Sequence, residues 1–277
     1  MLTTLKSILE IAEQSHSAIG SFNTPNLTSI KAVLAAAEEL QQPVILMHAQ
    51  VHEEMHLCQM EEIAPIMLFM AKRAKVPVCV HLDHATDLAY LKRGLALGFT
   101  SVMYDGSTLP SAENTENTKA AVAAAKAYGA SVEAEIGSMG SREGGGAADT
   151  SIYTDPAAAE QFVADTGIDA LACAFGTAHG FYTSTPKLDL ERLSEIHRRI
   201  SVPIVMHGGS GIRPEDYREV IRRGVRKVNY YTYMAKAGAA AISNREYQQF
   251  HDALTDAEQA MKGNVKTAIS IFSGKSN

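Results

Sequence analysis

Two hydrophobic patterns alternate along the chain. Short apolar runs rich in β-branched side chains are typical of buried strands, and apolar residues that recur every three or four positions predict amphipathic helices. Strands are expected at residues 17–22, 43–48, 77–82, 100–104, 130–136, 168–173, 203–207 and 225–229. Helices are expected at 26–41, 59–74, 86–97, 111–128, 155–166, 188–199, 214–223 and 232–242. The chain therefore consists of repeated strand–helix units.

These units indicate the fold class. Eight strands that alternate with helices within 277 residues predict a (β/α)8 TIM barrel, an α/β fold, as one domain over residues 1–277. The first residues, MLTTLKSILEIAEQ, predict a leading helix, and the end of the chain predicts a C-terminal helical extension. An open doubly wound sheet is the alternative, but it needs a glycine-rich turn after the first strand, where this chain reads SFNTPN.

Composition narrows the class of protein. With 46% hydrophobic residues, 20% charged residues and a mean hydropathy of −0.07, the chain has the composition of a globular domain. A formal charge of −6 argues against nucleic acid as a partner. The chain has no apolar stretch of the roughly 20 residues that cross a bilayer. Three cysteines without paired spacing suit a reducing compartment. We expect a cytoplasmic protein that binds neither nucleic acid nor membranes.

Three histidines follow apolar runs and precede small residues. They are His84 in VCVHLDHATD, His179 in LACAFGTAHG and His207 in PIVMHGGSG. In a TIM barrel the carboxyl ends of the strands meet at one face, where the chemistry collects. A catalytic zinc ion typically takes three protein ligands and keeps one open position. The three histidines therefore predict one metal site.

Asp83 precedes the first of these histidines. In an extended strand neighbouring side chains face opposite sides, so Asp83 and His84 can reach one site only where the strand ends. A carboxylate beside a metal ligand is a candidate for proton transfer. A structural Asp–His pair is the alternative interpretation.

Glycines after two of the histidines favour binding of an anion. In HGGSG the backbone N–H groups and the Ser210 hydroxyl lie just before a probable helix start, where a phosphate is well placed. TIM barrels bind phosphate with the loops after strands seven and eight, which are HGGSG and NYYTY here. A glycine-rich turn without a ligand is the alternative.

A glycine-rich stretch, AEIGSMGSREGGGAADT, follows the fifth strand. Such a loop could order over a substrate as a lid and carry Arg142 or Glu143 into the site. The alternative is a solvated surface loop.

Residues 52–56 read HEEMH and match a zinc-protease signature, His-Glu-x-x-His. That signature needs a continuous helix, whereas here it follows a predicted strand within a few residues and lacks the third histidine of its extended form. We therefore disfavour a protease. His48, Gln50 and His52, at the end of the second strand, are instead candidates for contact with a substrate.

Taken together, these motifs resemble those of the class II, zinc-dependent fructose- or tagatose-bisphosphate aldolases. SFNTPNL, PVIL, HLDHATD, SVMYDGS, VEAEIG, GTAHGFY, PKLD, HGGSGI and the N-x-x-T of NYYTY occur in the family's order over nearly the whole chain. The resemblance implies zinc on His84, His179 and His207, with Asp83 as the acid/base at the substrate hydroxyl. It implies that Glu143 exchanges a proton of the bound donor. It also assigns Asp105 and Glu135 to an alternative or second metal position.

The resemblance further implies a site for dihydroxyacetone phosphate. This site would comprise Gly180, Gly208, Gly209, Ser210, Asn229, Tyr230, Tyr231 and Thr232, with Asn23 facing it. A monovalent cation, Na⁺ or K⁺, would lie near Gly180 and Gly208, as in relatives. Relatives also form oligomers, so a homodimer or homotetramer is expected.

The chain departs from the family's pattern on the aldehyde side of the site. The stretch that corresponds to the family's mobile loop reads Gly140-Ser141-Arg142-Glu143-Gly144. In the family's N-x-(D/A)-T-(D/E) motif, Tyr231 replaces the Asp or Ala and Tyr233 replaces the final acid. His48-Ala49-Gln50 replaces a Thr-Ser-Pro region, and Thr255 stands where fructose-bisphosphate enzymes carry an arginine for the distal phosphate.

We therefore hypothesise a carbon–carbon lyase that reversibly splits a ketose 1-phosphate into dihydroxyacetone phosphate and an aldehyde. A ketose bisphosphate stays open as its substrate. Two alternatives are a metal-independent phosphate-binding barrel, such as an isomerase, and a non-catalytic regulatory relative. The isomerase would not need three histidines, and the regulatory relative would not need Asp83 and Glu143.

Overall fold

Eight parallel strands close into a barrel, as the hydrophobic pattern predicts. The computed structural model describes residues 1–137, 140–141, 153–180 and 186–274. The barrel strands are β2 (Ile19–Asn23), β3 (Val44–Ala49), β4 (Val78–Ala85), β5 (Ser101–Tyr104), β6 (Ser131–Ile136), β8 (Ala170–Cys173), β10 (Ile204–Met206) and β11 (Val225–Tyr230). Each pairs with the next, and β11 pairs with β2, so the sheet is closed. This confirms the (β/α)8 barrel.

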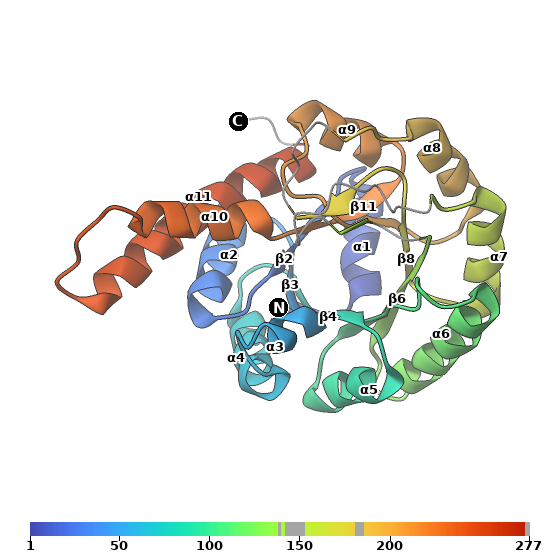
Figure 1. The fold of residues 1–277 in the computed structure, drawn as a ribbon, viewed down its shortest axis with the longest axis horizontal. Coiled ribbons are helices and arrows are strands. Elements are labelled where there is room, and N and C mark those ends of the chain that lie inside the picture. Colours follow the sequence, from blue (N-terminus) through green and yellow to red (C-terminus); the bar gives the residue numbers. More distant parts are fainter. Residues whose placement is uncertain (138–139, 142–152, 181–185, 275–277) are drawn as a thin grey trace.

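Helices surround the barrel in a ring (Figure 1). They are α2 (Leu27–Leu40), α4 (Met60–Arg73), α5 (Leu88–Leu97), α6 (Ser111–Lys126), α7 (Pro156–Thr166), α8 (Leu190–Arg199) and α9 (Pro214–Arg222). Several begin at side chains that accept hydrogen bonds from the first turn: Asn26 for α2, Asp87 for α5 and Asp155 for α7. Within the described part of the chain, none of the helices has the length and apolar character needed to span a membrane.

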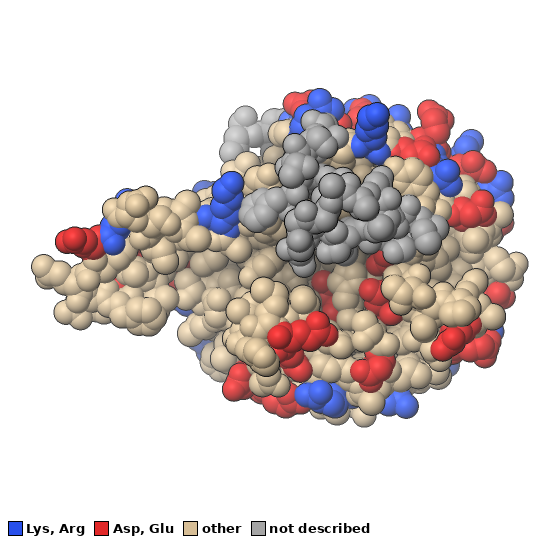
Figure 2. Space-filling view, in the orientation of Figure 1, with Lys and Arg blue, Asp and Glu red and all other residues tan. Residues whose placement is uncertain are grey.

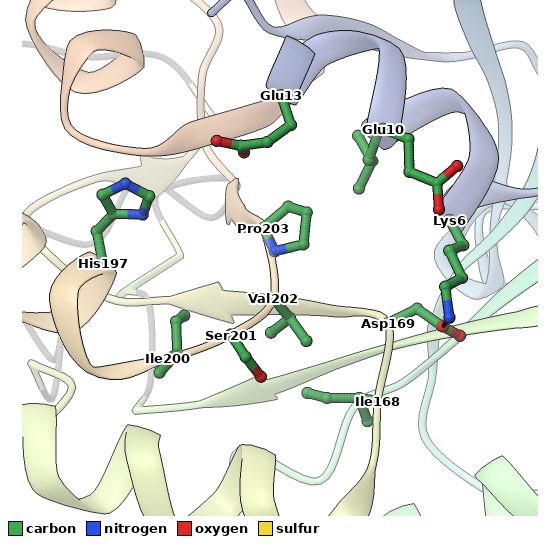
Figure 3. Close-up of a pocket in the computed structure, with 11 residues that line it drawn as sticks. Lys6, Glu10, Glu13, Ile168, Asp169, His197, Ile200, Ser201, Val202 and Pro203 are labelled. Atoms are coloured by element: carbon green, nitrogen blue, oxygen red, sulfur yellow. Dashed lines mark ion pairs between the residues drawn. The ribbon is translucent and has the colours of Figure 1, made fainter.

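The leading helix closes the barrel at the amino ends of the strands. After the short strand β1 (Leu2–Thr3), which pairs with β4, α1 (Leu5–Gln14) buries Leu5, Ile8 and Leu9 against inward-facing apolar side chains such as Ile45 and Met103. A cavity of about 500 Å³ lies at this end, between α1 and the segments that precede β8 and β10 (Figure 3). It is remote from the strand ends that carry the predicted histidines.

Two further helices form the C-terminal extension. α10 (Thr232–Ile242) and α11 (Phe250–Phe272) extend beyond the ring of helices on one side (Figure 1). α11 then returns to the barrel, where the backbone N–H of Ala18 donates to the carbonyl of Phe272 (2.9 Å). The Phe272 ring is 1% exposed and meets the ring of Tyr217 at a centroid distance of 4.9 Å. The end of α11 is thereby fixed beside the start of the first barrel strand, β2.

Phe272→Ala should lower the free energy of unfolding by about 3–5 kcal/mol, because it leaves a cavity where α11 meets the barrel. Phe250→Ala, at the other end of the same helix, is the matched control: Phe250 is 78% exposed, and its loss should change stability by about 0.5 kcal/mol or less. Urea unfolding of both variants measures the difference. Equal stability of the two variants would contradict this packing role.

Candidate active site

β4 is distorted at the two residues that sequence analysis placed together. We expected the strand to end there, but it continues to Ala85. β4 pairs with β5 in regular register up to Leu82, and the register shifts before Ala85. His84 has a φ of 50°, in the left-handed region. Because a bulge of this kind lets consecutive side chains turn to the same side, Asp83 and His84 reach one site from within the strand.

His84 and His207 meet at the carboxyl end of the barrel, although their strands are not neighbours in the sheet. Nε2 of His84 lies 2.9 Å from Nδ1 of His207. On the far side of each ring is a carboxylate oxygen: Oδ2 of Asp105 lies 2.7 Å from Nδ1 of His84, and Oε1 of Glu133 lies 2.8 Å from Nε2 of His207. Each imidazole is therefore oriented by an acidic residue.

These carboxylates decide which ring nitrogens are protonated. A carboxylate only accepts, so the nitrogens next to Asp105 and Glu133 carry hydrogens. The two nitrogens that face each other then both present lone pairs, which repel unless a positive charge lies between them. A proton can supply it: burial opposes a charge on His84, but Asp83 and Asp105 outweigh burial and raise the pKa of His84 to about 10. A metal ion fits the same place, since carboxylate-oriented imidazoles are typical zinc ligands.

Carboxylates supply further ligand atoms around this pair. The ligand atoms of Asp83, His84 and His207 lie within 4.8 Å of one another, and so do those of His84, Asp105 and Glu135. Oε2 of Glu135 is buried and has no hydrogen-bond partner in the described structure. Burial, and next the neighbouring Asp105, raise the pKa of Glu135 well above its usual value. This oxygen lies 3.8 Å from Nδ1 of His207 without forming a hydrogen bond there, so it can accept a cation.

The charge balance also favours a cation. The group contains four carboxylates, those of Asp83, Asp105, Glu133 and Glu135, and the ammonium of Lys227, which contacts Glu133. On the face shown in Figure 2, Asp and Glu side chains lie both near the centre and along the edge, whereas Lys and Arg side chains lie towards the edge.

Glu133 and Lys227 were missed by sequence analysis. Both are fully buried, and Nζ of Lys227 lies 2.9 Å from Oε2 of Glu133. The same ammonium donates to Oδ1 of Asn229 (2.7 Å), whose Nδ2 donates to Oδ1 of Asp83 (3.1 Å). Strand periodicity could have found them, because residues two apart share a face: Glu133 with Glu135, and Lys227 with Asn229.

Two predicted site residues fall beyond what the structure describes. It places the backbone of His179 in the short strand β9 (Ala178–His179), but its side chain lies outside the described part. Glu143, with Arg142, is outside the described residues altogether. Their roles as metal ligand and base stay predictions.

The two loops in which a glycine follows a histidine, GTAHG and HGGSG, are in contact. A Cβ at Gly208, where φ is 61°, would lie 2.4 Å from the carbonyl oxygen of Ala178, and one at Gly209 would lie 2.8 Å from that of Asn229. Only glycine fits so close to these backbones. The Ser210 hydroxyl accepts from the backbone N–H of Tyr231 (2.9 Å), at the start of α10.

The other residues predicted to contact the substrate lie on several elements of the barrel. Asn23 ends β2 and is buried, Thr232 is the first residue of α10, and Gly180 follows β9 with a φ of 93°. The Tyr230 ring packs instead against Phe22 in the hydrophobic layer, at a centroid distance of 5.8 Å. The backbone of Tyr230, rather than its ring, is therefore the part that lies with the segment expected to bind phosphate.

The His-Glu-x-x-His segment does not form the helix that a protease site needs. The short helix α3 (Gln50–Glu54) includes His52 and ends before His56, which is exposed with a φ of 55°. His52 is buried, and its ring lies 5.6 Å from those of both His48 and Tyr231. The two histidines of the motif thus lie in different environments, which excludes the protease interpretation.

Comparisons with known proteins point to one family. The family model for class II fructose-bisphosphate aldolase matches residues 3–277. The chain is 36% identical to a fructose-bisphosphate aldolase of Staphylococcus aureus (strain Mu50 / ATCC 700699), over 100% of this chain and 98% of that protein.

Two solved structures are also similar. The YdjI aldolase from Escherichia coli K12 has a TM-score of 0.89 and 33% identity, covering 98% of this chain and 97% of its own. A putative fructose-1,6-biphosphate aldolase from Coccidioides immitis has a TM-score of 0.86 and 30% identity, covering 97% and 95%.

The buried histidines beside the site should make the protein sensitive to acid. Burial lowers the pKa of His48 to about 4, whereas the unfolded chain takes up a proton near pH 6.5. Because the unfolded state binds more protons in this window, stability should fall as the pH drops from 6.5 towards 4.

His48→Gln removes one titrating group, so it should reduce this slope by up to about 1.4 kcal/mol per pH unit. Urea unfolding of both proteins at pH 7, 6 and 5 measures the slope. The stability of the variant should still depend on pH to some extent, because the pKa of His52 is lowered as well. Identical slopes would show that His48 does not contribute.

Proposed function

Because the chain belongs to the class II fructose-bisphosphate aldolase family, we propose that it uses zinc to cleave a ketose 1-phosphate reversibly into dihydroxyacetone phosphate and an aldehyde. As a member of that family the chain is an aldolase, and so a lyase. The observation that carries the finer proposal is the pair of imidazole nitrogens 2.9 Å apart, each backed by a carboxylate, with Asp83 in the same group.

His84 and His207 would hold the zinc ion together with His179, and Asp105 and Glu135 would serve an alternative or second position. Zinc supplies Lewis-acid stabilisation of the negative charge that develops at the ketose carbonyl. This need explains why imidazoles and carboxylates are gathered where parallel strands end.

Asp83 would accept the proton of the C4 hydroxyl while the C3–C4 bond breaks. The electron pair of that bond moves towards the carbonyl at C2, and the C4 oxygen becomes the carbonyl of the departing aldehyde. Asn229 donates to Asp83 and thereby orients the carboxylate. Glu143 would deliver a proton to C3 of the remaining donor, which completes dihydroxyacetone phosphate.

The loop of Gly208, Gly209 and Ser210 would bind the phosphate of the donor. Its backbone approaches the segment from Asn229 to Thr232 closely, and α10 begins there, so N–H groups and a helix N-terminus come together. Gly180 and Asn23 would complete this side, with a monovalent cation near Gly180 and Gly208. Holding the phosphate orients the reacting carbons, which lowers the barrier.

The aldehyde side favours a substrate without a second phosphate. His48 and His52 lie near enough to Asp83 to be influenced by its charge, and burial lowers the pKa of each to about 4. Both are therefore neutral at pH 7 and bring no positive charge to this side. Thr255 is exposed on α11, where its hydroxyl donates to the carbonyl of His251.

The wider setting follows from the same proposal. A single-domain cytoplasmic enzyme of carbohydrate metabolism, active as a homodimer or homotetramer, accounts for the composition and for the full-length match to aldolases. Its partner would be a small sugar phosphate.

Asp83→Ala should lower kcat roughly 10²–10⁴-fold, because it removes the acid/base, and should leave zinc bound. Asp87→Ala is the matched control: Asp87 caps α5, so its loss should cost about 1 kcal/mol of stability and leave turnover unchanged. A coupled assay for dihydroxyacetone phosphate and elemental analysis provide both readouts. Full activity of the Asp83 variant would remove this residue from its role.

A ketose 1-phosphate should have a kcat/KM at least as high as that of the matching 1,6-bisphosphate, because His48 and His52, the described side chains on this side, are neutral and do not offset the hydration that a second phosphate would lose. The two substrates differ only in the distal phosphate. The same coupled assay with both, at pH 7 and saturating zinc, measures the preference. A bisphosphate preferred by tenfold would contradict the proposed aldehyde side.

A further inference from the structure

Lys227 lies at the centre of the hydrogen-bond network beneath the proposed metal site. Its side chain is 0% exposed, and it projects from β11 between Glu133 on β6 and Asn229 on its own strand. An ammonium group only donates hydrogen bonds. Each group that contacts Nζ must therefore turn an acceptor towards it.

The first contact determines the tautomer of His207. Nζ of Lys227 lies 2.9 Å from Oε2 and 3.3 Å from Oε1 of Glu133, and Oε1 also lies 2.8 Å from Nε2 of His207. Since both oxygens of Glu133 are acceptors, His207 must donate through Nε2. Its Nδ1, which faces His84, is then left with a lone pair.

The second contact determines which way the Asn229 amide points. Oδ1 of Asn229 accepts from Lys227 (2.7 Å), so the NH₂ group of the amide points to Oδ1 of Asp83 (3.1 Å). Without the ammonium, the amide could turn over and present its oxygen to the carboxylate. Asp83 would then lose the donor that orients it.

We propose that Lys227 is a positioning residue that sets two hydrogen-bond directions at once: through Glu133 it presents Nδ1 of His207 to the metal, and through Asn229 it orients Asp83. The proposal rests on the proposed function for the roles of His207 and Asp83. The contacts that carry this proposal join Lys227 to Glu133 and Asn229. Its effect on His207 and Asp83 passes through these two residues.

Zinc affinity tests the His207 branch without any use of turnover. In Glu133→Gln, Lys227 competes with His207 for the single amide oxygen, so the amide NH₂ is driven towards Nε2 and the metal-facing nitrogen is protonated. Zinc affinity should fall about 10–100-fold. Adding Lys227→Met frees the oxygen to accept from His207, so the double variant should recover most of the lost affinity. A merely structural lysine would not produce recovery on its own removal.

Turnover tests the Asn229 branch. The double variant should bind zinc and still show kcat lowered on the order of 10²-fold with little change in KM, because Asp83 is no longer held in place. Its matched control is Arg226→Met with Glu13→Gln. Arg226 is the preceding residue on β11, 4% exposed, and pairs with Glu13 of α1 (2.8 Å). This control should lose stability while keeping its zinc affinity and kcat.

Two results would overturn the proposal: equal zinc affinity of Glu133→Gln and the double variant, or an unchanged kcat of the zinc-loaded double variant.

A third measurement needs no variant. ¹⁵N NMR of the histidine-labelled, metal-free protein should show His207 protonated at Nε2, and protonation at Nδ1 alone would refute the first branch. Should the unmodified protein cleave no ketose phosphate while the zinc affinities follow the predicted order, the proposed function fails and the His207 branch stands.

Discussion

The rest of the site depends on two imidazole nitrogens that face each other 2.9 Å apart. A carboxylate lies behind each of the two rings. Asp105 and Glu133 hold the hydrogens of His84 and His207 on the outer sides, so lone pairs are directed inward and need a positive charge between them. The bulge in β4, the buried Glu133–Lys227 pair and the surrounding acidic residues all serve this arrangement. It concentrates negative charge where a cation would bind.

The barrel keeps this polar site apart from the apolar core. At the amino ends of the strands α1 fills the interior with apolar side chains, so polar residues can be confined to the carboxyl ends. There the buried Glu133 faces the buried Lys227, and the half-buried His84 faces Asp105. Removing one member of such a pair leaves an uncompensated charge in a low-dielectric interior, which is more costly than replacing both members. The site and the core beneath it are therefore one structural unit.

Sequence alone predicted the barrel because its strands and helices have strong, regular hydrophobic periods. It also brought Asp83, His84 and His207 together, because parallel strands end at one face. The bulge at His84 could not be read from the sequence, since a left-handed φ at a histidine has no reliable local signal. Glu133 and Lys227 were missed because charged residues inside an apolar run looked like exceptions to it. Tyr230 was assigned to the substrate site as part of the segment from Asn229 to Thr232; its ring packs against Phe22 in the hydrophobic layer, which strand alternation could have indicated.

X-ray absorption at the zinc edge, on the zinc-loaded protein and on His84→Ala and His207→Ala variants, tests the central claim most directly. We expect imidazole nitrogens at about 2.0–2.1 Å from zinc in the unmodified protein and fewer of them in each variant, with weaker binding. A zinc environment that either variant leaves unchanged would contradict it, because the two facing nitrogens would then not be ligands.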